Sequence, residues 1–116
     1  MIKTFEEITS RQKSQKLATQ VYKQFSQIKD YWFKDQIQRC VVSISNNIAE
    51  WFERKSNNEF KYFLYIAKWS CWEFRSMLYL AKSLWYMEND LFESLYSESI
   101  EISKSIYWLI ISLKQK

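Results

Sequence analysis

A row of positive charges with aromatic neighbours is the feature of this sequence that points most directly to chemistry. Its cations lie seven residues apart, at Lys61, Lys68, Arg75 and Lys82. Seven residues make about two helical turns, so the four charges of this basic row share one face of a helix. An aromatic residue follows each cation by four positions, at Tyr65, Trp72, Tyr79 and Tyr86. Because cations bind phosphates and unpaired bases stack on planar rings, the basic row predicts RNA binding.

Smaller groups of cations extend the predicted RNA-binding surface to other parts of the chain. The first helix carries a shorter row of Lys13, Lys16 and Lys23, and the second helix carries or adjoins Arg39, Arg54 and Lys55. The formal net charge of +4 at pH 7 is modest. An alternative interpretation therefore stays open, in which these charges only form the solvated faces of the helices.

The residue types present exclude most catalytic and metal chemistry. The 116 residues include no Gly, no Pro and no His. Glycine-rich phosphate loops, nucleophiles paired with His and His-ligated metal sites are therefore excluded. Cys40 and Cys71 lie far apart and fall on apolar stripes, which indicates small core side chains rather than zinc ligands or a disulfide. We predict no catalytic residue, no metal, no cofactor and no small-molecule substrate.

Two polar residues of the second helix, Asn47 and Glu50, are predicted to be structural. A buried amide must be hydrogen-bonded, so Asn47 is expected to hold the backbone of the loop that follows its helix. Glu50 is expected to pair with Arg39 or Arg54, or to cap backbone, since no His is available to complete a carboxylate metal site.

The spacing of apolar residues predicts four helices within one domain that covers residues 1–116. Their expected ranges are about 5–28, 33–52, 57–86 and 91–113. Ser56 and Glu59 form a capping-box pattern at the start of the third helix. Its core stripe repeats every seven residues in two registers, with Phe60, Ala67, Phe74 and Ala81 in one and Leu64, Cys71, Leu78 and Trp85 in the other. Four amphipathic helices with short connections predict an all-α, antiparallel up-down-up-down four-helix bundle.

The third helix also carries apolar residues outside its core stripe. They are Tyr62, Tyr65, Ile66, Trp69, Trp72 and Tyr79, called here the outer face. A helix that is apolar on two sides is usually buried on both, and in so short a chain the second side is expected to meet another subunit. The outer face therefore predicts a homo-oligomer.

The chain has no sequence pattern that predicts export or membrane insertion. Its first residues lack the apolar segment of a signal peptide, and the apolar run 106–111 is far too short to span a bilayer. We expect a reduced, cytoplasmic protein.

The segments that adjoin these features resemble a known family. The relevant stretches are Gln36–Arg39, Val42–Ile44, Asn47–Glu50, Arg54–Ser56, Glu59–Phe60, Phe63–Leu64, Ser70–Cys71, Glu73 and Arg75–Ala81. Together they closely resemble the 23S rRNA intervening-sequence proteins. That resemblance implies a four-helix subunit that assembles as a ring, typically a homopentamer, and a gene often lodged within a large ribosomal RNA gene.

The resemblance also supplies a second candidate function. Relatives of that family include the accessory variability determinant of diversity-generating retroelements, which resembles an adaptor for RNA and reverse transcriptase. The alternative to RNA binding is therefore a protein-interaction adaptor that docks a partner such as a reverse transcriptase and touches RNA little.

The chain departs from this family in a patterned way. Relatives commonly carry Gly where this sequence has its six tryptophans, Trp32, Trp51, Trp69, Trp72, Trp85 and Trp108, and often Pro at Ser45. One hypothesis is that the gene reads UGA as Gly, in which case a positive φ is expected at the helix ends, Trp51 or Trp85. The rival hypothesis is that the rings are genuine and fill a subunit interface.

Overall fold

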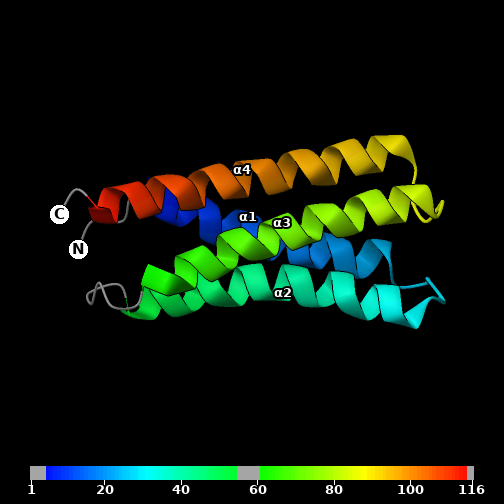
Figure 1. The fold of residues 1–116 in the computed structure, drawn as a ribbon, viewed down its shortest axis with the longest axis horizontal. Helices are drawn as coiled ribbons and strands as arrows, with labels where there is room; N and C mark the ends of the chain where they lie inside the picture. The colour runs from blue at the N-terminus through cyan, green and yellow to red at the C-terminus, as the bar shows by residue number, and fades with distance from the viewer. Residues whose placement is uncertain (1–4, 55–60, 115–116) are drawn as a thin grey trace.

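The computed structural model describes residues 5–54 and 61–114, with side chains over 9–54 and 61–113. Those residues form four helices and no strand: α1 (Phe5–Gln24), α2 (Tyr31–Arg54), α3 (Tyr62–Ser83) and α4 (Asn89–Lys114). The start of α1, the end of α2, the start of α3 and the end of α4 lie at one end of the molecule (Figure 1). The all-α, four-helix expectation is confirmed.

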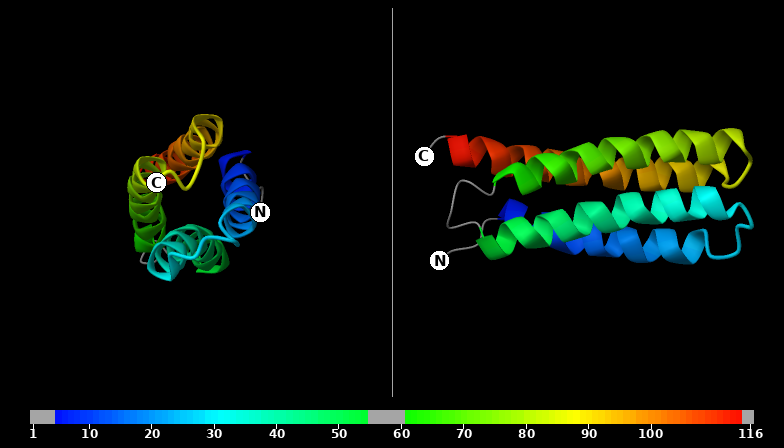
Figure 2. Two further views of the ribbon diagram at one scale, coloured as in Figure 1. Left: turned by 90° about the vertical axis from the view of Figure 1, so that its right-hand side faces the viewer. Right: turned by 60° about the horizontal axis from the view of Figure 1, so that its bottom comes forward.

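Each helix packs against two others, so the four surround a single axis. The contacting pairs are α1 with α2, α2 with α3, α3 with α4 and α4 with α1, as the end-on view shows (Figure 2). The assembly is 46 Å long and 23 by 18 Å across. Every helix therefore turns one stripe toward the axis and leaves its opposite side exposed.

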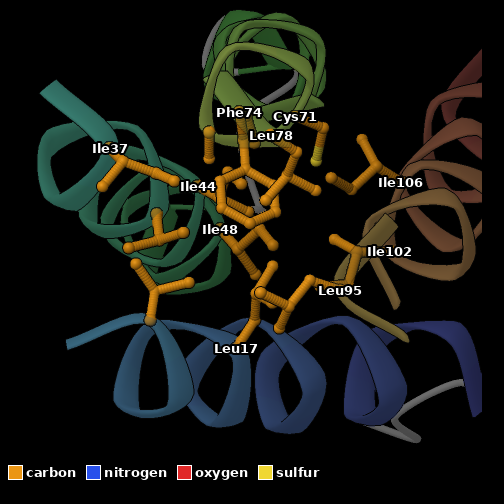
Figure 3. Close-up of a cluster of buried hydrophobic side chains, with 14 of the residues drawn as sticks. Leu17, Ile37, Ile44, Ile48, Cys71, Phe74, Leu78, Leu95, Ile102 and Ile106 are labelled. Atoms are coloured by element: carbon orange, nitrogen blue, oxygen red, sulfur yellow. The ribbon is translucent and has the colours of Figure 1, made fainter. Parts of the chain in front are cut away.

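The axis is filled by apolar side chains from all four helices. Phe74 and Leu78 of α3 point toward Ile102 of α4, Ile44 of α2 and Leu17 of α1 (Figure 3). Each of these side chains is at most 1% exposed, and burying one contributes about 1.5–3 kcal/mol. The predicted stripe of the third helix is confirmed at Leu64, Ala67, Cys71, Phe74, Leu78 and Ala81.

Hydrogen bonds hold together the two turns at the other end of the bundle. Asp30 precedes α2, and its Oδ1 accepts a 3.0 Å bond from the Phe33 amide, as an N-cap carboxylate does. Its Oδ2 accepts a 2.7 Å bond from the Tyr86 hydroxyl. The Tyr86 ring also packs edge-on against Phe33, with ring centroids 5.1 Å apart. The α1–α2 turn is thus fixed to the α3–α4 turn.

The helix ends differ from the predicted ones. α1 ends at Gln24 rather than near 28, and α3 ends at Ser83, before the predicted core residue Trp85. Trp85 is 92% exposed with φ 64°, so its assignment to the core stripe is wrong: the chain has left the helix there and turns the ring into solvent. Ser56, Glu59 and Phe60 lie outside the described residues.

None of the helices, as far as the structure describes them, combines the length and the apolar character needed to cross a membrane.

Candidate nucleic-acid interface

The basic row lies along the side of α3 that borders α4. The Lys68 ammonium stands 5.3 Å from the centre of the Tyr107 ring, and the Lys82 ammonium stands 4.6 Å from the centre of the Phe92 ring. Both distances fall within the range of a cation–π interaction, which orients a cation without neutralising its charge. The aromatic rings of α4 therefore fix two charges of the row.

Arg75 is attached to α4 by hydrogen bonds. Its Nη1 donates to the Ser99 hydroxyl at 3.0 Å and to the Ser103 hydroxyl at 2.9 Å. Ser99 is buried and Arg75 is half-buried, so these bonds are partly shielded from water. Both partners are neutral, and the positive charge of Arg75 is therefore held in place but not cancelled.

Over the residues that the structure describes, no carboxylate forms an ion pair with any cation of the basic row. The carboxylates bind other cations. Glu101 of α4 pairs with Lys13 of α1, which lowers the pKa of Glu101 by hydrogen bonding and by charge. Within α2, Arg39 pairs with Asp35 at 2.8 Å and Arg54 pairs with Glu50 at 3.2 Å. The positive charge of the row is uncompensated, whereas that of these three cations is matched.

The other predicted cations lie apart from the row. Lys16 and Lys23 are exposed on α1, which contacts α4 and α2 but not α3. Lys61, the first cation of the row itself, is the exposed N-cap residue of α3. Lys55 lies outside the described residues. The structure thus places Lys68, Arg75 and Lys82 on the side of α3 that borders α4, and it leaves the α1 lysines on a separate surface.

Aromatic side chains lie beside the row over part of its length. A surface hollow of about 410 Å³ is lined by Tyr65, Lys68, Trp69, Trp72 and Arg75. Trp69 and Trp72 meet edge-on within it, with ring centroids 6.2 Å apart. Tyr79, Lys82 and Tyr86 line a second surface hollow, and Tyr86 also holds the turns together through its ring and hydroxyl.

The outer face is exposed in the single chain. Tyr62, Tyr65, Ile66, Trp69, Trp72 and Tyr79 all have more than two fifths of their surface accessible. Tyr79 also packs against Phe92 and Tyr96 of α4, with ring centroids 5.1 and 5.7 Å away. The outer face therefore continues onto α4 at one end.

Asn47 and Glu50 have structural partners. The Asn47 amide donates to the Ser43 carbonyl at 2.8 Å and to the Ser43 hydroxyl at 3.2 Å, and that hydroxyl is 2.8 Å from the hydroxyl of Ser70 on α3. Asn47 thus bonds the preceding turn of its own helix, not the loop that follows. Glu50 pairs with Arg54, one of its expected partners.

The two thiols lack the features of reactive cysteines. Burial raises the pKa of Cys71 to about 11, against the smaller opposing effects of hydrogen bonds from Ser103 and Ser99 and the charge of Arg75. Burial, with the charge of Glu73 added, raises the pKa of Cys40 to about 11. Both are therefore protonated near neutral pH and act as small apolar side chains. The described residues include no group of metal-ligating side chains.

The α4 partners of the basic row were not predicted from the sequence. Ser99 and Ser103 are four residues apart, so they share one face of a helix. Two serines on the inner side of an otherwise apolar helix were the sequence feature that could have indicated a polar partner there. Only the packing of α4 beside α3 shows which cation they bind.

Fold and surface together define a class of small four-helix proteins with an uncompensated basic row along one helix. A family model described as 23S rRNA-intervening sequence protein matches residues 6–108, and the chain belongs to that family. The resemblance inferred from the sequence is confirmed.

A solved structure shows the same fold. It is the crystal structure of a protein of unknown function from the S23 ribosomal protein family of Bacteroides thetaiotaomicron, with a TM-score of 0.83. The match covers 91% of this chain and 98% of that one, at 24% sequence identity, and at that identity it bears on fold alone. No match was found among curated proteins.

Proposed function

We propose that this protein is a non-catalytic, cytoplasmic RNA-binding protein and that its basic row is the RNA contact. One observation carries the proposal. Over the described residues, no cation of the row is paired with a carboxylate, while α4 holds Lys68, Arg75 and Lys82 in position. Lys13, Arg39 and Arg54, by contrast, pair with carboxylates. When such unpaired cations bind phosphates, they displace the counterions condensed on the nucleic acid. The release of those counterions is the main source of affinity in nucleic-acid binding.

The hollow beside the row favours RNA with unpaired bases. Tyr65, Lys68 and Arg75 stand together at its wall, so in a single chain a base stacked on a ring would have its phosphate near a cation. Self-association through the outer face would instead cover these rings and leave the cations as the RNA contact. The family's name refers to 23S rRNA, and an RNA transcribed from that region is the first ligand to test.

Self-association would multiply these contacts. The proposed unit is an up-down-up-down bundle that joins further copies through its outer face into a ring, a pentamer by the family resemblance. Rows from several subunits would then face one RNA, and modest single contacts would combine through their high effective concentration.

The test compares two variants with the same net charge. One carries Lys61→Glu, Lys68→Glu and Lys82→Glu on the row, and the control carries Lys29→Glu, Lys34→Glu and Lys104→Glu, which lie outside every group of cations predicted to bind RNA. Three reversals remove six charges, so both variants go from +4 to −2. Arg75 is kept because it holds α4. Binding to a structured 23S rRNA fragment is measured at several salt concentrations.

The row variant is expected to bind the fragment much more weakly and to lower the slope of log affinity against log salt by about two. The control is expected to lose less affinity. Equal losses in both variants would mean that net charge alone drives binding and that the row is not the contact.

The outer face favours a second candidate function, an adaptor that docks a partner enzyme such as a reverse transcriptase. A contiguous exposed apolar surface is typical of protein contacts. RNA association that survives the row reversals, but is lost when the outer face is altered, would favour this candidate.

A further inference from the structure

We propose that the gene uses UGA as a glycine codon, so that the six tryptophans of this sequence are glycines in the protein made by its own cells. The inference does not rest on the proposed function, although glycine at 69 and 72 would remove two of the five side chains that line the hollow. A chain of this length would contain about 8 glycines at average usage. This one contains none, and it contains six tryptophans.

The strongest single observation is the backbone at residue 85. Trp85 has φ 64°, the left-handed region in which a side chain collides with backbone and which glycine enters at no steric cost. It is the one non-glycine residue with positive φ among those the structure describes.

The hydrogen bonds around Trp85 identify the turn that requires this conformation. The Trp85 amide donates to the Lys82 carbonyl at 3.2 Å, and the Tyr86 amide donates to the Ala81 carbonyl at 2.9 Å. This pair of bonds after the helix cap Leu84 is a Schellman motif. Trp85 occupies the position of that motif which glycine usually fills.

The exposure of the tryptophans supports the same inference. Five of the six are more than half exposed, namely Trp32, Trp69, Trp72, Trp85 and Trp108, and the sixth, Trp51, is buried. The phenylalanines form an internal comparison: none of those with described side chains, Phe25, Phe33, Phe52, Phe63, Phe74 and Phe92, is exposed. The fold thus turns these phenylalanines inward and leaves most of the tryptophans in solvent. Tryptophan is highly buried on average, so this distribution is unusual for tryptophan.

A single subunit interface does not account for these rings. Trp69 and Trp72 belong to the outer face of α3, but Trp32 lies on α2, Trp108 on α4 and Trp85 on the turn. With glycine at 69 and 72, the outer face would keep Tyr62, Tyr65, Ile66 and Tyr79, and no side chain would project at the two glycine positions. Such a surface admits another helix at short distance.

Two measurements test the inference directly: the codons at the six positions, and the masses of peptides from the protein purified from its own cells. The expected result is UGA at all six codons and peptides carrying glycine. UGG codons would overturn the inference, and so would UGA codons with tryptophan in the peptides.

A recombinant comparison tests the argument at residue 85 on its own. Trp85→Gly is expected to melt a few degrees higher than Trp85→Ala, because alanine also carries a Cβ into the left-handed region. Equal melting temperatures for the two variants would overturn the assignment of glycine at this position.

Discussion

Among single residues, Arg75 contributes to both the surface and the interior. Truncation by Arg75→Ala should lower the free energy of unfolding by about 1–3 kcal/mol, because the buried Ser99 hydroxyl loses its partner. Lys61→Ala removes the same charge from an exposed side chain and should change stability by less than about 0.5 kcal/mol. Urea unfolding of both variants measures the difference. Similar stabilities would show that the bonds to Ser99 and Ser103 contribute little.

The sequence predicted the alignment of the candidate site's cations along one helix, but not the residues that contact them. The spacing of Lys61, Lys68, Arg75 and Lys82 could be interpreted because a helix repeats regularly along the chain. The pairs Arg39–Asp35 and Arg54–Glu50 follow the same short-range rule and were open to prediction. Lys13 and Glu101 are 88 positions apart, and only the packing of α1 against α4 brings them together.

At the scale of the element, the turn between α1 and α2 supports a prediction about acid stability. The Phe33 amide and the Tyr86 hydroxyl both bond the Asp30 carboxylate and lower its pKa below the ordinary value of 3.8. The unfolded chain then binds a proton at Asp30 more tightly than the folded chain does. The stabilisation is therefore complete above pH 3.8 and is lost as the pH falls through the lower folded-state value.

Asp30→Asn is the variant that isolates this effect. Asparagine is as good an N-cap as aspartate and keeps an oxygen for the Phe33 amide, but it does not titrate. We expect its melting temperature to fall less steeply with acidification than that of the parent chain. Thermal unfolding followed by circular dichroism over a pH series measures both slopes, and parallel curves would contradict the role assigned to Asp30.

Helix interiors were predictable, and so were the ends of α2 and α4 to within two residues, whereas the C-terminal ends of α1 and α3 were not. The seven-residue repeat from Leu64 to Leu78 places every member in the core because burial of one stripe decides the interior of a helix. The end of α3 depends instead on two hydrogen bonds in the turn, to Ala81 and Lys82. A pattern of apolar residues contains no signal for such bonds, so it placed Trp85 in the core.

For the whole molecule, the four-helix arrangement leaves the side chains of the outer face more than two fifths exposed over the part of the chain that the structure describes. The axis already holds the inward stripes of α1 to α4, and the outer face lies outside this core, with Tyr79 at one end packed against rings of α4. Tyr65 and Ile66 are each 41% exposed near its centre. Exposed apolar groups that lie together in this way favour burial against a further copy.

The outer face can be tested without any tryptophan. We expect the parent chain to show a mass several times 14.3 kDa by light scattering, and a Tyr65→Lys, Ile66→Lys variant to approach the mass of one chain. Association would bury the two lysine ammonium groups without a partner, and the lost hydration of these charges would disfavour the contact. The matched control, Tyr22→Lys with Tyr31→Lys, changes exposed tyrosines on α1 and α2 and should keep the parent mass. A parent chain that is already monomeric, or equal masses for both variants, would exclude this face as the contact, provided that circular dichroism shows unchanged helix content.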